Sequence, residues 1–207
     1  MVGFLAASAD GYGLRYGKNH KREMRETIVR QAAARFRKDG LAAVGVRPLM
    51  TDAGLTHGGF YSHFASRDAL VAEALESALG ETLSSLTAAV AAAEPGKGLE
   101  AFIDSYLDPR HCTRPDKGCA GASLAPEIAR EDEPVRRAFE QGIERIVLLL
   151  ASQLPSRFND AERRSRAHAI FAMLMGALQL ARLALDPAEA SAILSTARKS
   201  SLRLALD

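Results

Sequence analysis

The sequence predicts an all-α protein. Apolar residues recur at helical spacing along most of the chain, alanine and leucine dominate, and no segment shows the strict alternation of a half-buried strand. Hydrophobic residues make up 47% and charged residues 25% of the chain, as in an ordinary globular protein. We expect about nine helices, arranged as an N-terminal three-helix domain and a larger helical bundle.

The first helix is expected to begin near Lys21. Residues 1–19 contain four glycines and show no periodicity, so a flexible tail with a basic end is predicted there. Apolar residues then share one helix face at Ile28, Ala32 and Phe36. Gly40 follows as a left-handed C-terminal cap, because glycine adopts positive φ without steric cost.

Two short helices follow, separated by a glycine turn. The second helix is predicted from Val46 to Ala53, with Pro48 in its first turn, where a missing N–H costs little. Gly54 breaks this helix, and Thr56 is a natural N-cap for a third helix at 57–64. Three short helices with such a turn have the proportions of a helix-turn-helix, whose third helix enters the major groove of DNA.

The rest of the chain predicts a helical bundle. Ser66 caps a fourth helix that runs to about Ala93, and the sequence EPGKG (94–98) forms a loop. The turn-rich segment 108–118 is expected to be irregular. The last helix has Asp186 as its N-cap and a proline at its first position. The later helices are predicted at 99–107, 124–130, between Pro134 and Pro155, at 160–185 and at 187–204.

The glycine turn and the segment after it carry a recognisable signature. The run from Gly54 to Phe64, GLTHGGFYSHF, and the following Ser-Arg-Asp-Ala-Leu at 66–70 closely resemble the DNA-binding signature of the TetR family. The resemblance covers about residues 20–75. It implies a homodimeric transcriptional regulator with a helix-turn-helix DNA-binding domain at 20–66 and an effector-binding and dimerisation domain at 67–207.

The resemblance also assigns roles in DNA binding. Thr56 is expected to meet a phosphate, Tyr61 to bond the DNA backbone and Arg67 to stand near a phosphate. Phe60 and Phe64, four residues apart, should face the core of the domain. Departures from the family pattern at Gly45 and Pro48 put the role of Arg47 in doubt. The full set of predicted DNA-binding residues is Arg47, Thr56, His57, Gly58, Tyr61, Ser62, His63 and Arg67.

The charge distribution agrees with a DNA-reading N-terminal third. Residues 1–70 hold 11 Lys and Arg against 6 Asp and Glu, and the remaining residues hold 16 against 19. A basic third attached to a mildly acidic body is typical of a DNA-binding head, since phosphate contacts supply most of the affinity for DNA. The expected partner is double-stranded operator DNA, bound by a homodimer at a near-palindromic site.

The apolar pattern of the last two helices predicts a dimer interface. The helical bundle is expected to hold an effector pocket. A wide apolar face in the long eighth helix is expected to pack against a second chain, aided by Ile193, Ala197 and Leu204, and burial of this face within the monomer alone is the alternative. This face comprises Ile170, Leu174, Ala177, Leu178, Ala181 and Leu185, widened by Met173, Gly176 and Leu180. Candidate residues for the pocket of an unknown small-molecule effector are Phe102, Tyr106, Phe139, Ile143, Phe171 and Met175.

Two cysteines form a second possible effector site. Cys112 and Cys119 lie among His111, Arg110, Arg114 and Lys117, and nearby cations lower the pKa of a thiol. A thiol that senses oxidants or electrophiles, a disulfide between the two cysteines, and inert buried cysteines are the alternatives that the sequence leaves open.

Other classes of protein fit the sequence less well. No Ser/His/Asp arrangement, metal-ligand cluster or phosphate loop appears, so we expect no enzyme activity, cofactor or metal. A helical adaptor without DNA binding and a small helical enzyme are the alternatives, and an activator remains open beside a repressor. No long apolar run or charged leader is present, so we expect no membrane association and a cytoplasmic location.

Overall fold

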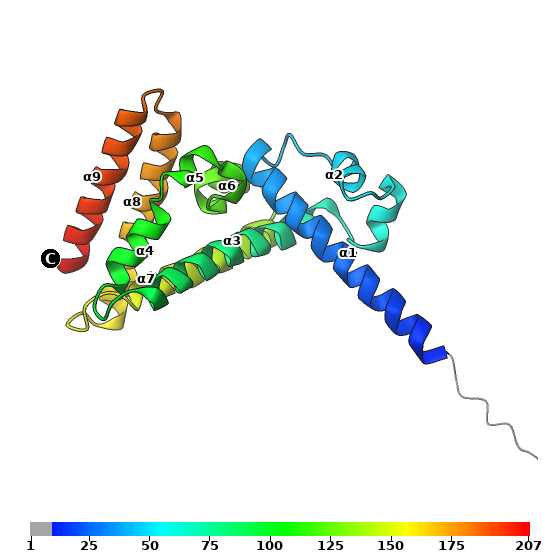
Figure 1. Cartoon of the computed structure of the whole chain (residues 1–207), viewed down its shortest axis with the longest axis horizontal. Coiled ribbons are helices and arrows are strands. Elements are labelled where there is room, and N and C mark those ends of the chain that lie inside the picture. The colour runs from blue at the N-terminus through cyan, green and yellow to red at the C-terminus, as the bar shows by residue number, and fades with distance from the viewer. Residues whose placement is uncertain (1–9) are drawn as a thin grey trace, which may run out of the picture.

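The computed structural model describes the backbone of residues 10–207 and the side chains of residues 19–207. Within this range the chain forms nine α-helices and two 3₁₀ turns and contains no strand, which confirms the all-α prediction (Figure 1). The elements are α1 (Asp10–Asp39), α2 (Val46–Asp52), η1 (His57–Ser62), α3 (Arg67–Ala92), α4 (Gly98–Tyr106), α5 (Arg110–Thr113), η2 (Pro115–Lys117), α6 (Ala120–Ile128), α7 (Glu133–Ala151), α8 (Asp160–Leu183) and α9 (Pro187–Leu206).

The elements form two parts, which we call the head (α1, α2 and η1) and the body (α3 to α9). Figure 1 shows α2 and η1 beside α1 at one end of the molecule and the α8–α9 pair at the other. The long helix α3 runs between them with α7 packed along it. The core is continuous from Ile28 and Phe36 in the head to Leu174 and Leu178 in α8.

Side-chain caps fix several of the helix starts. Ser66 Oγ accepts a hydrogen bond from the Ala69 N–H at 3.1 Å, and Asp186 Oδ1 accepts one from the Ala188 N–H at 2.9 Å, as predicted. Asn159 and Glu162 form a reciprocal capping box at the start of α8. These caps satisfy backbone donors that the first turn of a helix leaves unpaired.

The first helix begins earlier than predicted. It starts at Asp10, so residues 10–19, which were expected to belong to the tail, are helical, and residues 1–9 lie outside the described part of the chain. The stretch from Ile28 to Phe36 is packed in the core, and each residue that extends the helix toward the N-terminus adds a backbone hydrogen bond at little further cost. Side-chain periodicity, on which the prediction rested, does not register this gain.

Two further elements differ in extent. The segment 108–118 contains the single turn α5 and the 3₁₀ turn η2, and α6 begins at Ala120 rather than near Leu124. A Cβ atom at Gly121 would stand 3.2 Å from Ile143 Cδ1 and 3.3 Å from Met175 Cε. The small residues at 120–122, which resemble a loop, therefore allow α6 to pack closely against α7 and α8.

The predicted dimer stripe of α8 is divided between the monomer core and the surface. Ile170, Leu174 and Leu178 are fully buried within the chain itself, where they meet the rest of the body. Leu180, in contrast, is 57% exposed. The prediction was wrong for the buried set, because apolar periodicity identifies a buried face without indicating which chain covers it.

Close packing between α3 and α7 gives the first test of the fold. A Cβ atom at Gly142 would stand 2.9 Å from Leu79 Cβ and still closer to Leu79 Cδ1. Gly142→Ala should therefore lower the free energy of unfolding by about 1–3 kcal/mol, as overpacked cores do. Gly80→Ala in α3 is the matched control, because no atom lies within 4 Å of its added Cβ, and it should raise stability by about 0.5–1 kcal/mol. Urea unfolding measures the stability of both variants. Equal free energies of unfolding for Gly142→Ala and Gly80→Ala would contradict the close packing of α3 and α7.

Candidate DNA-binding surface and regulatory contacts

The turn between α2 and η1 sets the position of the predicted recognition segment. Gly54 has a φ of +73°, which an L side chain rarely adopts. Its N–H donates to Thr51 O at 2.9 Å, and the Leu55 N–H donates to Met50 O at 2.8 Å. The glycine turn predicted from sequence is therefore the bend that separates the two short elements.

The recognition segment is a 3₁₀ helix that ends at Ser62, shorter and tighter than the predicted helix at 57–64. Gly58 and Gly59 adjoin within its six residues, and glycine costs up to about 1 kcal/mol per residue in a helix. Thr56 occupies the N-cap position, but its side chain accepts no capping hydrogen bond. The predicted cap is therefore positional only, and the Thr56 side chain stays exposed.

Buried aromatics fix this segment on the head. Phe60 and Phe64 are 1% and 2% exposed, which confirms their predicted place in the core. Their rings stack with centroids 5.5 Å apart. The Arg25 guanidinium lies 4.3 Å from the centroid of Phe64 and also binds the Glu73 carboxylate, so it joins α1, the residues directly after the recognition segment, and α3.

The other predicted DNA-binding residues lie around this anchored edge. Tyr61 is 70% exposed, and its ring meets Phe60 edge-on. Ser62 is also exposed, but its hydroxyl donates to Gly59 O at 2.7 Å. The exposed members of the predicted set are Arg47, Thr56, His57, Gly58, Tyr61 and Ser62.

Arg67 and His63 are more enclosed than the rest. Arg67 Nη2 donates to Leu41 O at 2.6 Å, so at least part of its guanidinium stabilises the turn after α1. His63 is half-buried, and its Nδ1 atom is buried without a hydrogen-bond partner. Burial, followed by the charges of Lys21 and Arg25, lowers the pKa of His63 below its ordinary value.

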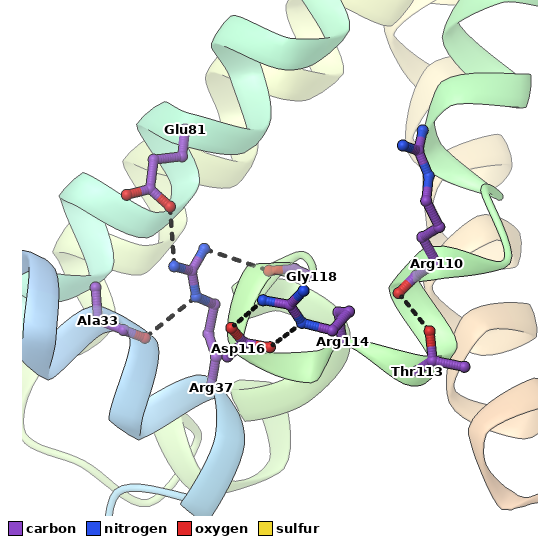
Figure 2. A network of polar contacts seen from close by, with 8 residues as sticks. All are labelled: Ala33, Arg37, Glu81, Arg110, Thr113, Arg114, Asp116 and Gly118. Carbon is purple, nitrogen blue, oxygen red and sulfur yellow. Dashed lines mark hydrogen bonds and ion pairs between the residues drawn. The ribbon is translucent and has the colours of Figure 1, made fainter.

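A buried arginine joins the head to the body. The Arg37 side chain is only 4% exposed, and its Nη2 atom lies 2.9 Å from Glu81 Oε2 on α3. Its Nε atom donates to Ala33 O at 3.1 Å and its Nη1 atom to Gly118 O at 3.5 Å. Figure 2 shows this guanidinium between α1, α3 and the loop that follows η2.

A second contact lies at the turn after α1. Glu127 Oε2 on α6 accepts hydrogen bonds from the Leu41 N–H at 2.8 Å and the Ala42 N–H at 3.2 Å. Gly40 has a φ of +85°, and a Cβ atom there would stand 2.9 Å from Glu127 Oε1. Glycine at this position thus serves both as the predicted cap of α1 and as room for the carboxylate.

The surroundings of the two cysteines differ from those predicted. Both thiols are free, with Cys112 half-buried and Cys119 buried at the start of α6. The neighbouring Arg110 and Arg114 pair with Asp108 and Asp116. Burial raises the pKa of Cys112 above its ordinary value, so the predicted lowering by adjacent cations is wrong for this thiol.

The six residues predicted for the effector pocket are divided between the core and its edge. Phe102, Tyr106 and Phe171 are buried in the core, and the Tyr106 and Phe171 rings pack edge-on at 5.3 Å. Phe139, Ile143 and Met175 are partly buried. Tyr106 lines a small cavity beside α3 and the segment 111–119. The effector-pocket prediction therefore stays a prediction for all six residues.

Comparison with known proteins identifies the family. A model of the bacterial regulatory proteins of the tetR family matches residues 28–74, and one of the LmrA/YxaF-like transcriptional regulator C-terminal domain matches residues 95–198. The chain belongs to the TetR family of transcriptional regulators. It is therefore a DNA-binding helix-turn-helix regulator and not an enzyme.

Two regulators of Bacillus subtilis (strain 168) are similar in sequence. The HTH-type transcriptional regulator LmrA is 25% identical over 121 residues, which span 58% of this chain and 64% of LmrA. The uncharacterized HTH-type transcriptional regulator YerO is 31% identical over 64 residues, which span 31% of this chain and 22% of YerO. Both matches thus span less than two thirds of the relative.

Solved structures of the family share the fold. The TetR-family regulator from Cytophaga hutchinsonii superposes with a TM-score of 0.74 at 19% identity, covering 91% of this chain and 98% of that one. The reduced form of E. coli NemR gives a TM-score of 0.72 at 19% identity, covering 86% and 95%. At these identities the likeness concerns the fold alone.

Within the described residues, no cluster of three or more His, Cys, Asp or Glu side chains is arranged to hold a metal ion. In the same part of the chain, no helix is both long and apolar enough to cross a membrane.

Sequence reasoning missed the residues that link head and body. Arg37, Glu81 and Glu127 carry no motif. One signal was present for the first of them, because Arg37 follows Ala33 by four residues and so continues the buried face of α1. A charged residue on an apolar helix face needs a partner, and the structure supplies Glu81.

The lowered pKa of His63 makes a pH prediction. When pH falls through the ordinary value of 6.5, the unfolded chain binds a proton at this position more readily than the folded chain does. The contribution of neutral His63 to the free energy of unfolding is therefore complete above pH 6.5 and is lost as the pH falls below that value. Unfolding in urea at pH values of about 7.5 and 5.5 should show a smaller loss on acidification in His63→Gln than in the wild type. Ser62→Ala serves as the local control, and equal losses in His63→Gln and the wild type would refute the assignment.

Proposed function

We propose that this regulator is a repressor that binds a near-palindromic operator as a homodimer and leaves it when an effector binds the body. The exposed edge of the head supports the DNA-binding part most directly. Tyr61, His57 and Gly58 are solvent-exposed on a segment that buried Phe60 and Phe64 hold in place. A rigidly anchored edge with exposed polar groups is what reading of a major groove requires.

In this proposal the contacts divide into two kinds. Thr56, Tyr61 and Arg47 contact the DNA backbone and supply affinity, since backbone contacts fix register without reading sequence. His57, Gly58 and Ser62 face base edges and supply specificity, with His63 beside them. Arg67 stabilises the head through Leu41 O and offers the rest of its guanidinium to a phosphate.

The outer face of α8 and α9 supports a homodimer. A groove of about 540 Å³ runs between these helices, lined by residues that include Met173, Gly176, Leu180 and Ile193. Leu180, which lines it, is 57% exposed. Burying a leucine side chain contributes about 1.5–3 kcal/mol, so a second copy of this face is a favourable cover. Two heads spaced about 34–36 Å apart would then meet successive major grooves.

The effector part of the proposal follows from the linkage between head and body. An effector that favours a different placement of the heads shifts the population away from the DNA-binding form. We favour a small-molecule effector over a thiol-reactive one, because burial raises the pKa of Cys112 and thereby lowers its thiolate fraction. Whether the regulator represses or activates depends on the position of the operator, and repression is the simpler outcome of occupying a promoter.

Salt-titrated binding to the DNA that flanks the gene of this protein tests the DNA-binding proposal. Two chains should bind per site, and affinity should fall steeply with salt. Tyr61→Ala should weaken binding by about tenfold, because a charge-assisted bond to a phosphate and an exposed aromatic contact are lost. Leu148→Ala on α7, another exposed apolar residue, is the control and should bind as the wild type does.

The same binding experiments can also refute the operator and dimer proposals. If flanking DNA shows no selective binding, a random-sequence selection extends the search to every possible operator. Weak, salt-sensitive binding without any selected sequence, equal in wild type and Tyr61→Ala, would refute the operator proposal. One chain per site would refute the dimer.

A further inference from the structure

A small enclosed cavity lies between α3, α4 and the segment 111–119. Its volume is about 70 Å³, and its lining includes Glu81, Ser105, Tyr106, His111, Lys117 and Cys119. One water needs about 10–15 Å³ of such space, so the cavity has room for roughly five water-sized groups. Most of these side chains are polar, which distinguishes the cavity from an ordinary packing defect.

One lining group is a donor without a partner. The Tyr106 side chain is fully buried, and its hydroxyl has no nitrogen or oxygen partner among the described groups; the Cys119 thiol beside it is only a weak hydrogen-bonding group. Buried polar groups nearly always have a partner, so an unpaired hydroxyl at a cavity indicates a place for a ligand or water. Burial, followed by the adjacent Cys119, raises the pKa of Tyr106 well above its ordinary value, which keeps the phenol protonated as a donor.

The backbone around this hydroxyl is held firmly. His111 Nδ1 lies 2.9 Å from Tyr106 O, and the Arg182 Nε atom donates to His111 O at 3.1 Å. Arg182 also donates to Ser123 Oγ at 2.9 Å, while its Nη2 atom is buried without a partner. A second unsatisfied donor, and a cationic one, thus stands close to the same segment.

The local charges favour an anion. Glu81 is paired with Arg37, and Asp116 is paired with Arg114 at 3.2 Å (Figure 2). Lys117 at the edge of the cavity is exposed, and no carboxylate of the described side chains lies within 4 Å of its ammonium group. The cavity therefore combines a buried neutral donor with a cation at its mouth.

We propose that this cavity is the effector site and that it binds a small monocarboxylate of about four to six non-hydrogen atoms. The carboxylate of the ligand accepts a hydrogen bond from the Tyr106 hydroxyl and faces Lys117. This inference rests on the proposed effector response and names its ligand class. Glu81, which binds Arg37, lines the site, so its occupant is positioned to alter the contact between body and head.

Isothermal titration of the full chain without DNA tests the site, with acetate, propionate and pyruvate as probes. At least one of them should bind saturably with one molecule per chain. Tyr106→Phe should weaken that binding by about tenfold or more, since it removes the donor and keeps the ring. Lys117→Gln should weaken it by about two- to tenfold and reduce its dependence on salt. Lys97→Gln, which removes an exposed lysine that pairs with Glu100 and does not line the cavity, should leave it unchanged.

Three results would overturn the proposal. They are the absence of saturable binding of all three probes, binding that both variants leave unchanged, and binding of uncharged acetamide as tight as that of acetate. Thermal melting of Tyr106→Phe verifies that this variant is folded. Because no DNA is present, failure here is separate from failure of operator binding, which the titration with DNA measures on its own.

Discussion

The buried guanidinium of Arg37 is the contact on which the arrangement of the molecule depends. It binds the carboxylate of Glu81 on α3 and backbone carbonyls in α1 and at Gly118, so three elements meet at one side chain. A charge removed from water is stable only when its hydrogen bonds are met together, which fixes these elements relative to one another. Glu127 adds a second point of attachment at the turn after α1. A regulator needs such a linkage, because effector binding in the body must change DNA binding by the head.

Most of the fold follows from local sequence rules. The caps at Ser66 and Asp186 are present as predicted, and helical apolar spacing located most of the helices of the body. The errors arose where local rules say little. Residues 10–19 are helical because the packed part of α1 propagates toward the N-terminus, and α6 starts early because small residues there allow close packing. Neither effect is visible in the hydrophobic pattern alone.

The candidate site divides in the same way. The exposed edge around Tyr61 and the buried Phe60 were predictable, because a signature and a four-residue spacing place them. The contacts of Arg37 join residues 81 positions apart, and no spacing rule reaches so far. The charges around Cys112 were misread for a related reason. Sequence showed the cations, whereas their pairing with nearby carboxylates and the burial of the thiol depend on the folded segment.

Hydrogen exchange of Arg37→Met measures this linkage most directly. Arg130→Met, which removes an exposed arginine of the body, is its control. If Arg37 holds the head in place, backbone amides at 40–64 should exchange faster in Arg37→Met than in the wild type, while those of α8 keep their protection. Equal protection of residues 40–64 in Arg37→Met, Arg130→Met and the wild type would show that the head is held by other contacts and would contradict the central role of this arginine.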